Sequence, residues 1–193
     1  MSETQTETYT KAEFWKCALQ VNPWNYIQYR GTEHGLPEDE YNRQLVRIAL
    51  ENNIKVIGYA DHGCVDGLDA LRTVMNEHGI IVFPGFEISS TEKVHFVCLF
   101  SEETSCKELH RIMGKLDLLN PENGVCPSKL GGNELIRLVT SELGGFIYAA
   151  HCTEDSGLLQ KKLVHVWQDN DLRAVQIPGT LEDLKNGESN TYR

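Results

Sequence analysis

The sequence predicts an α/β fold built around a largely parallel sheet or barrel. Short apolar runs alternate with segments of helical spacing along most of the chain, which is typical of α/β proteins. The length of 193 residues suits one domain with a sizeable core. Because neither a repeat nor a linker divides the chain, we expect one domain over residues 13–180, a disordered tail over 1–12 and a loose segment over 181–193.

The first half of the chain is expected to hold three strands and two helices. Apolar runs predict the strands, at 14–21, 55–60 and 80–83. Helical spacing predicts the helices, at 38–53 and 68–78, and Gly79 is expected to end the second one. Pro84-Gly85 is expected to end the third strand. The apolar side chains of segment 22–37 favour a loop that packs onto the domain.

The second half is expected to add three strands and three helices. The strands are predicted at 94–100, 146–150 and 173–177, and the helices at 105–119, 133–143 and 157–168. Asn133 is the expected N-cap of the middle helix, which Gly144-Gly145 end. The total is six expected strands.

The chain is acidic, with 18 Lys and Arg against 28 Asp and Glu, a net charge of −10. This balance excludes a protein that binds nucleic acid or an anionic membrane through bulk positive charge. An anionic substrate therefore needs local positive charge, from a few side chains or from metal ions. Without metal or a basic partner, we expect weak binding to nucleic acid.

The remaining motif content is sparse. The six cysteines contain no CxxC pair, and neither a secretory signal nor an apolar stretch of about 18 residues is visible. We therefore expect a cytoplasmic protein with reduced thiols and no membrane partner. The patterns GxGxxG, GxxxxGKS/T and GxSxG are absent, so these residues offer neither an ATP-binding phosphate loop nor a hydrolase nucleophile elbow.

Polar side chains gather at the ends of the expected strands. They are Gln20 and Asn22 on the first, Asp61 and His62 after the second, Glu87 after the third, His95 on the fourth and His151 after the fifth. Carboxyl ends of parallel strands meet at one rim, where α/β proteins build their sites. Imidazole and carboxylate groups together are ligands for Zn²⁺, Mn²⁺ or Fe²⁺. The pattern predicts a polar or metal site at this rim.

Each of these residues also has a simpler interpretation. Asp61-His62 before a glycine suits a turn, Glu87 a solvated rim, His95 a hydrogen-bonded core position and His151 a loop contact. Cys64 and Cys152 lie close to candidate histidines in the sequence. They suit a nucleophile or a metal ligand, and the simpler interpretation is a small buried side chain. A polar or metal site is favoured because all four of these features are expected at the same rim.

These motifs, in this order, resemble the PHP (polymerase and histidinol phosphatase) family over residues 14–177. The residues that carry the resemblance are Asp61-His62 after KVIGYA, Gly85-Phe86-Glu87 after IIVF, then His95, and Ala150-His151. The segment FWKCALQVNPWNYIQYRG most resembles the PHP module of TrlF-type proteins, in which an ATPase region follows. The resemblance implies a distorted β/α barrel of seven strands, two or three bound metal ions and hydrolysis of phosphoesters.

The resemblance also implies roles for individual residues. Glu87 matches a carboxylate that bridges two metals, His95 and His151 match ligands of the second metal, and His62 matches a ligand of the third, with Asp61 its companion. The family's first motif, Asp-Leu-His-x-His, is replaced by Ala18-Leu19-Gln20-Val21-Asn22, so amides of Gln20 and Asn22 stand at ligand positions. A final Asp-x-His has no match. We expect one to three divalent ions, Mn²⁺ or Zn²⁺, with the first site depleted.

An active domain of this type would perform metal-assisted hydrolysis. The metals would polarise a phosphoryl oxygen and lower the pKa of a bound water toward about 7. Glu87 would position the metals, and Asp61 or His62 would orient or protonate the leaving oxygen. Arg30 and Lys93 are candidate phosphate contacts, with plain surface charge as the alternative. Trp24, Tyr26 and Tyr29 suit either core packing or stacking on bases.

The replacement of the first motif by Ala18-Leu19-Gln20-Val21-Asn22 leaves two functions open. One is a metal-dependent phosphoesterase acting on nucleic acid or nucleotides, in a PHP–ATPase system. The alternative is a degenerate, non-catalytic PHP domain that docks to or regulates an ATPase or nuclease partner. The TrlF-type resemblance implies a role in bacterial defence or nucleic-acid processing. The missing final motif suits either degeneration or a sequence that continues beyond Arg193.

Overall fold

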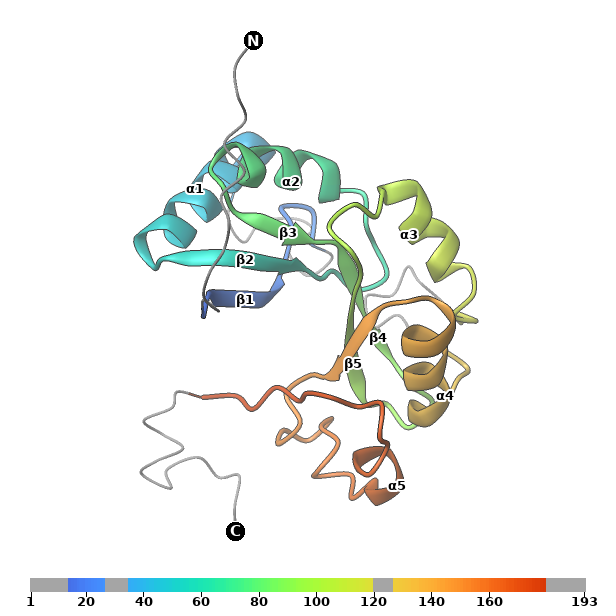
Figure 1. Ribbon diagram of the computed structural model, residues 1–193. Coiled ribbons are helices and arrows are strands. Elements are labelled where there is room, and N and C mark those ends of the chain that lie inside the picture. Colours follow the sequence, from blue (N-terminus) through green and yellow to red (C-terminus); the bar gives the residue numbers. More distant parts are fainter. Residues whose placement is uncertain (1–13, 27–34, 120–126, 180–193) are drawn as a thin grey trace, which may run out of the picture.

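The computed structural model describes residues 14–26, 35–119 and 127–179 (Figure 1). Its centre is a pair of three-stranded sheets. The first is parallel, in the order β1 (Lys16–Val21), β2 (Ile54–Tyr59) and β3 (Ile81–Phe83). The second is antiparallel, in the order β4 (Gly85–Ser89), β5 (His95–Leu99) and β6 (Phe146–Ala149). The fold is therefore mixed α/β, and the expectation of a largely parallel sheet is wrong for its second half.

The two sheets are joined where β3 runs into β4. Pro84 interrupts the ladder because it has no N–H to donate. The chain then continues as a strand at Gly85, where a Cβ atom would overlap the carbonyl oxygen of Cys98. Pro84-Gly85 therefore ends β3 at Phe83, as expected, and the chain continues at once as β4, a strand that was not expected. A parallel bridge between His62 and Glu87 connects the end of β2 to β4.

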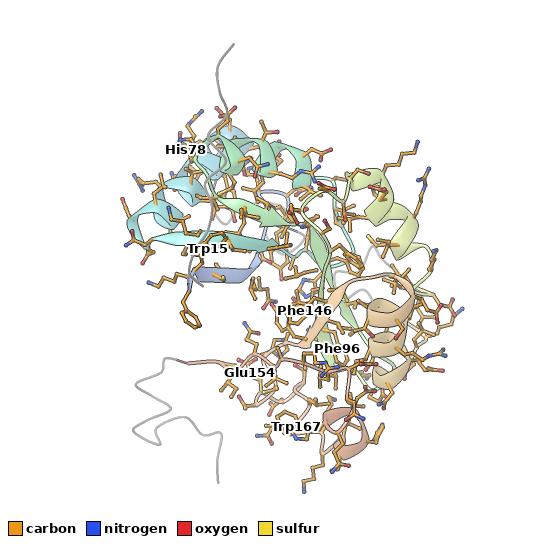
Figure 2. The ribbon with its side chains drawn as sticks, viewed as in Figure 1. Trp15, His78, Phe96, Phe146, Glu154 and Trp167 are labelled. Atoms are coloured by element: carbon orange, nitrogen blue, oxygen red, sulfur yellow. The ribbon has the colours of Figure 1, made fainter. Side chains whose placement is uncertain are left out.

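The helices cover the outer faces of these sheets. They are α1 (Glu38–Glu51), α2 (Leu68–Glu77), α3 (Cys106–Met113), α4 (Gly132–Arg137), the π-helical turn η3 (Leu138–Glu142) and α5 (Val164–Trp167). Figure 1 shows α1 and α2 together over the parallel sheet, and α4 beside the antiparallel one. His78, after α2, and Trp167 of α5 lie at opposite ends of the molecule, with Phe96 of β5 between them (Figure 2).

Two groups of buried apolar side chains form the core. The larger fills the space between helices and sheets, and includes Leu71, Phe86, Phe96 and Leu135. The smaller lies among the strands and includes Val97, Leu99 and Tyr148. The Tyr148 hydroxyl donates to the carbonyl of Leu19 at 3.1 Å, which ties β6 to β1. Among the described residues, no backbone hydrogen-bond ladder joins β1 to β6. The described strands therefore do not close into a full barrel.

Two expected elements in the last third differ in the structure. Lys162 has a φ of +54°, which an α-helix does not allow, so helix α5 begins only at Val164 and the expected helix over 157–168 is mostly turns. The expected strand over 173–177 makes only an isolated parallel bridge, between Val175 and Ala149. The neighbouring residue Gln176 donates its N–H to the carbonyl of Ala149, the last residue of β6, and accepts the N–H groups of His151 and Cys152 in the loop that follows.

The N-cap of the expected helix over 133–143 also differs. The helix begins after Gly131, whose N–H donates to Glu134 at 2.8 Å. Asn133 lies inside the helix, and its amide donates to the carbonyl of His165 and to Asp169. Asn133 therefore fastens α4 to the segment around α5 and caps no helix.

No helix among the described residues is both long and apolar enough to cross a membrane. The expected tail over 1–12 and end segment over 181–193 lie outside the described residues. Arg30 and Tyr29 lie outside them as well.

Candidate metal centre

Glu87 lies at the centre of the candidate site. It lies inside β4, every residue of which is buried, and its side chain is 2 % exposed. The sequence placed Glu87 beyond a strand end, and the structure places it within a strand. A carboxylate removed from water to this degree needs partners for both oxygens.

Three imidazole nitrogens surround one oxygen of this carboxylate. Oε1 of Glu87 lies 2.8 Å from Nδ1 of His95, 3.4 Å from Nε2 of His62 and 3.9 Å from Nε2 of His151. The other oxygen, Oε2, accepts a hydrogen bond from Nε2 of Gln20 at 2.5 Å. The structure thus brings together six of the predicted site residues: Glu87, His62, His95, His151, Gln20 and, next to His62 in the chain, Asp61.

Strand direction explains why these side chains meet. His62 follows β2, Glu87 is the middle residue of β4, two residues before its last residue, and His151 lies two residues after β6. His95 begins β5, and because β5 runs antiparallel to both neighbours, its first residue lies at the same edge as their last residues. The His95 carbonyl accepts from the N–H of Ala150 at 2.9 Å, which fixes His151 beside it.

Asp61 supports the backbone at this edge. Its Oδ1 accepts the N–H of His62 at 2.7 Å, and its carbonyl oxygen accepts the N–H of Glu87 at 2.8 Å. Asp61 is fully buried. These two contacts set the backbone that carries both His62 and Glu87.

His151 has an unusual backbone conformation, with a φ of +28°. Gln176 stabilises it: Oε1 of Gln176 accepts the N–H of His151 at 2.8 Å, and its carbonyl accepts the N–H of Cys152 at 2.9 Å. Strained backbone of this kind costs about 1–3 kcal/mol and is common at functional sites. Gln176 is not among the residues predicted from the sequence, because its one signal is a polar residue between the apolar Val175 and Ile177.

The charges of the cluster shift one another's pKa values. Burial alone raises the pKa of Glu87, but the imidazoles of His151, His95 and His62 outweigh it and lower the pKa to about 2. Burial lowers the pKa of His62, against the attraction of Glu87. The Glu87 carboxylate raises the pKa of His151, against burial. Glu87 is therefore an anion at neutral pH, with neutral His62 beside it.

The remaining candidates lie in varied surroundings. Lys93 is exposed in the turn between β4 and β5, two residues before His95. Tyr26 is buried, with its ring 5.4 Å from that of His62, which favours core packing for this residue. Burial raises the pKa of the Cys152 thiol, which favours a small buried side chain over a nucleophile. Arg30 lies outside the described residues.

The residues present fit a divalent cation. Buried Oδ1 of Asn22 has no hydrogen-bond partner within the described part of the chain, and neither does Nδ1 of His62, the ring nitrogen other than the one that faces Glu87. A buried polar atom without a partner is costly, and a ligand or ion that it binds removes the cost. One carboxylate with several imidazoles is the donor set of Zn²⁺ and related ions, and ligand atoms of His62, Glu87 and His95 lie within 4.8 Å of one another.

Solved structures of similar fold exist at low sequence identity, whereas neither a protein-family model nor a curated protein matches the chain. The lesion-specific endonuclease EndoQ of Pyrococcus furiosus is 14 % identical over 82 % of this chain, with a TM-score of 0.56. The chain spans 40 % of that endonuclease. Endonuclease Q is also known in complex with a 27-mer duplex that has an abasic lesion at the active site, a structure with a TM-score of 0.57.

Two further structures match over more of their own length. A protein of Bifidobacterium adolescentis described as a metal-dependent phosphoesterase is 16 % identical, with a TM-score of 0.50, over 84 % of this chain and 76 % of that one. An amidohydrolase of Chromobacterium violaceum is 15 % identical, with a TM-score of 0.54, over 89 % of this chain and 81 % of that one. The chain therefore shares the fold of phosphoesterase-type proteins, as the PHP resemblance implied, and none of these structures is of TrlF type.

Proposed function

We propose that this chain is a metal-dependent phosphoesterase whose metal centre is built on Glu87. The observation that carries the proposal is the approach of three imidazole nitrogens to Oε1 of one buried carboxylate, at 2.8, 3.4 and 3.9 Å. Such a cluster at the edge of a phosphoesterase-type fold is suited to hydrolysis.

Each residue has a defined part in this proposal. Glu87, His62, His95 and His151 hold Mn²⁺ or Zn²⁺, and Asn22 adds an amide oxygen. A bound ion supplies Lewis-acid polarisation of a phosphoryl oxygen and activation of water. Asp61 positions the metal ligand His62 by accepting its backbone N–H. Gln20 occupies Oε2 of Glu87, which reduces the number of ions to one or two.

The proposed substrates are phosphodiesters or phosphomonoesters of nucleic acid or nucleotides. The DNA complex of endonuclease Q, a protein of similar fold, supports this class. The net charge of −10 opposes binding of a polyanion, so the metal ions supply the attraction, with Lys93 and Arg30 as candidate phosphate contacts. A basic partner protein would strengthen it.

The test is metal content followed by hydrolysis. The full chain is stripped with chelator, reloaded with Mn²⁺ or Zn²⁺ and measured by mass spectrometry, then assayed on bis(p-nitrophenyl) phosphate and a fluorescent single-stranded oligonucleotide. We expect ion binding, a thermal shift and turnover, all lost in Glu87→Gln. Glu154→Gln, which changes an exposed carboxylate near His151, is the matched control and should retain them. Absence of bound metal, or turnover that survives Glu87→Gln, would contradict the proposal.

The hydrogen bond from Gln20 to Glu87 favours a second candidate function. An amide N–H satisfies the carboxylate without an ion, as a non-catalytic domain requires. In this alternative the domain docks to or regulates an ATPase or nuclease partner, in a cytoplasmic defence system of the TrlF type. This alternative predicts that the protein is folded without metal, that adding metal does not change its stability, and that it shows no turnover. Gln20→His combined with Asn22→His would then increase metal content, while wild type would retain none.

A further inference from the structure

A second cluster of potential metal ligands lies outside the Glu87 site. It consists of Asp66, in the connection from β2 to α2, and Cys106 and His110 of α3. Cys106 and His110 are four residues apart in one helix, so their side chains share a face. Ligand atoms of all three residues lie within 4.8 Å of one another.

The contacts within this cluster suit a tetrahedral ion. Nε2 of His110 lies 3.2 Å from Oδ1 of Asp66. Around Zn²⁺, with bonds of about 2.0–2.3 Å, neighbouring ligand atoms lie roughly 3.3–3.6 Å apart. The oxygen and nitrogen are therefore already near ligand spacing. Since all ligand atoms lie within 4.8 Å of one another, the sulfur has to approach by up to roughly 1.5 Å, which is within reach of a side-chain rotation.

The backbone that carries these ligands is fixed by other contacts. Sγ of Cys106 donates to the carbonyl of Val65 at 3.4 Å, next to Asp66. Arg72 of α2 donates to the carbonyl of Thr104 at 2.8 Å, just before α3. Ser105 and Glu108 form a capping box that fixes the first turn of α3. Figure 1 shows the start of α3 beside the connection that leads into α2.

An ordinary surface ion pair is the competing interpretation. The side chains of His110 and Asp66 are 54 % and 68 % exposed, and exposed pairs contribute little to stability. A plain pair does not involve the partly buried thiol of Cys106 at the same place, whose hydrogen bond is to the carbonyl of Val65. Exposure also suits a metal site, since water completes the coordination.

We propose that Asp66, Cys106 and His110 form a second metal site, selective for a borderline-soft divalent ion such as Zn²⁺. Sulfur as a ligand favours Zn²⁺ over Mn²⁺ or Mg²⁺. On binding, the Cys106 thiol releases its proton to solvent as the zinc–sulfur bond forms. Asp66 follows His62 by four residues, so the ion fastens the connection that carries His62 to helix α3.

Cobalt spectroscopy tests this site separately from the Glu87 cluster. Co²⁺ substitutes for Zn²⁺, and a thiolate ligand gives a charge-transfer band in the near ultraviolet, which ligands of the Glu87 cluster lack. We expect the full chain to show this band, and excess Zn²⁺ to abolish it. Cys106→Ser should remove the band, and His110→Ala or Asp66→Asn should weaken Co²⁺ affinity by about tenfold or more. Glu87→Gln should keep the band.

Matched variants separate the proposal from nonspecific binding. Cys17→Ser removes an exposed thiol on β1, and His165→Ala an exposed imidazole on α5, so both should keep the band. A wild-type protein without the band, or a band that survives Cys106→Ser, would overturn the proposal. Circular dichroism monitors folding, and if Cys106→Ser fails to fold, unchanged Co²⁺ affinity in His110→Ala overturns it equally.

Discussion

Gln20 of β1 donates a hydrogen bond from Nε2 to Oε2 of Glu87 in β4, at 2.5 Å, and so joins the parallel sheet to the antiparallel one. The two oxygens of Glu87 thereby face different surroundings, an amide on one side and three imidazoles on the other. Position 20 therefore controls whether Oε2 is available to a cation.

Gln20→Ala is expected to destabilise the metal-free protein. The substitution leaves a buried carboxylate with one hydrogen bond fewer, at a cost of about 1–3 kcal/mol. Urea unfolding at neutral pH with chelator measures the change. Gln44→Ala, which removes an amide bonded to Glu40 on the surface of α1, is the control and should cost less than about 0.5 kcal/mol. Equal losses in both variants would show that the bond to Glu87 contributes nothing.

The stability of the metal-free protein should depend on Glu87 at acidic pH. In the folded state its pKa is about 2, below the ordinary value of 4.5, so its ionised form stabilises the fold above pH 4.5. This contribution is lost as pH falls from 4.5 toward 2, and amounts to about 2 kcal/mol by pH 3. Urea unfolding between pH 5 and pH 3 should therefore show a shallower decline in Glu87→Gln than in wild type. Parallel declines would contradict the assignment.

Gln176 is expected to act as a positioning residue for His151. Gln176→Ala removes the acceptor of the His151 N–H and should weaken metal affinity about tenfold, with roughly 1 kcal/mol lost in stability. Gln176→Glu keeps an acceptor oxygen and should restore affinity. Isothermal titration with Mn²⁺ measures both variants, and Gln168→Ala, an exposed glutamine after α5, is the control. Unchanged affinity in Gln176→Ala would exclude this role.

Gly58→Ala should separate β1 from β2. A Cβ atom at position 58 would overlap the backbone of Leu19, the residue before Gln20, and overpacking of this kind costs about 3 kcal/mol. The shift of β1 should also weaken the bond from Gln20 to Glu87. Gly79→Ala is the control: Gly79 has a φ of +69° with open space around it, so the cost is about 1 kcal/mol of backbone strain. Thermal unfolding ranks the two, and the reverse order would contradict the prediction.

Local sequence signals predicted most elements of the fold. The apolar runs at 55–60 and 94–100 became β2 and β5, and the helical spacing at 38–53 and 68–78 became α1 and α2. These local signals failed where long-range contacts decide the secondary structure. β4 was missed because Pro84-Gly85 usually ends a strand, whereas here pairing with β5 and the contact with Asp61 continue the chain as a new strand.

The sequence by itself determined which side chains are available at the site: Glu87, His62, His95 and His151, with amides at positions 20 and 22. Their alternation with apolar strands was sufficient to predict that they meet. Only the tertiary structure decided how they meet, because antiparallel pairing of β5 brings His95 to the edge formed by the ends of β4 and β6. Distances across sheets, such as that from Gln20 to Glu87, follow from strand packing and leave no local signal in the sequence.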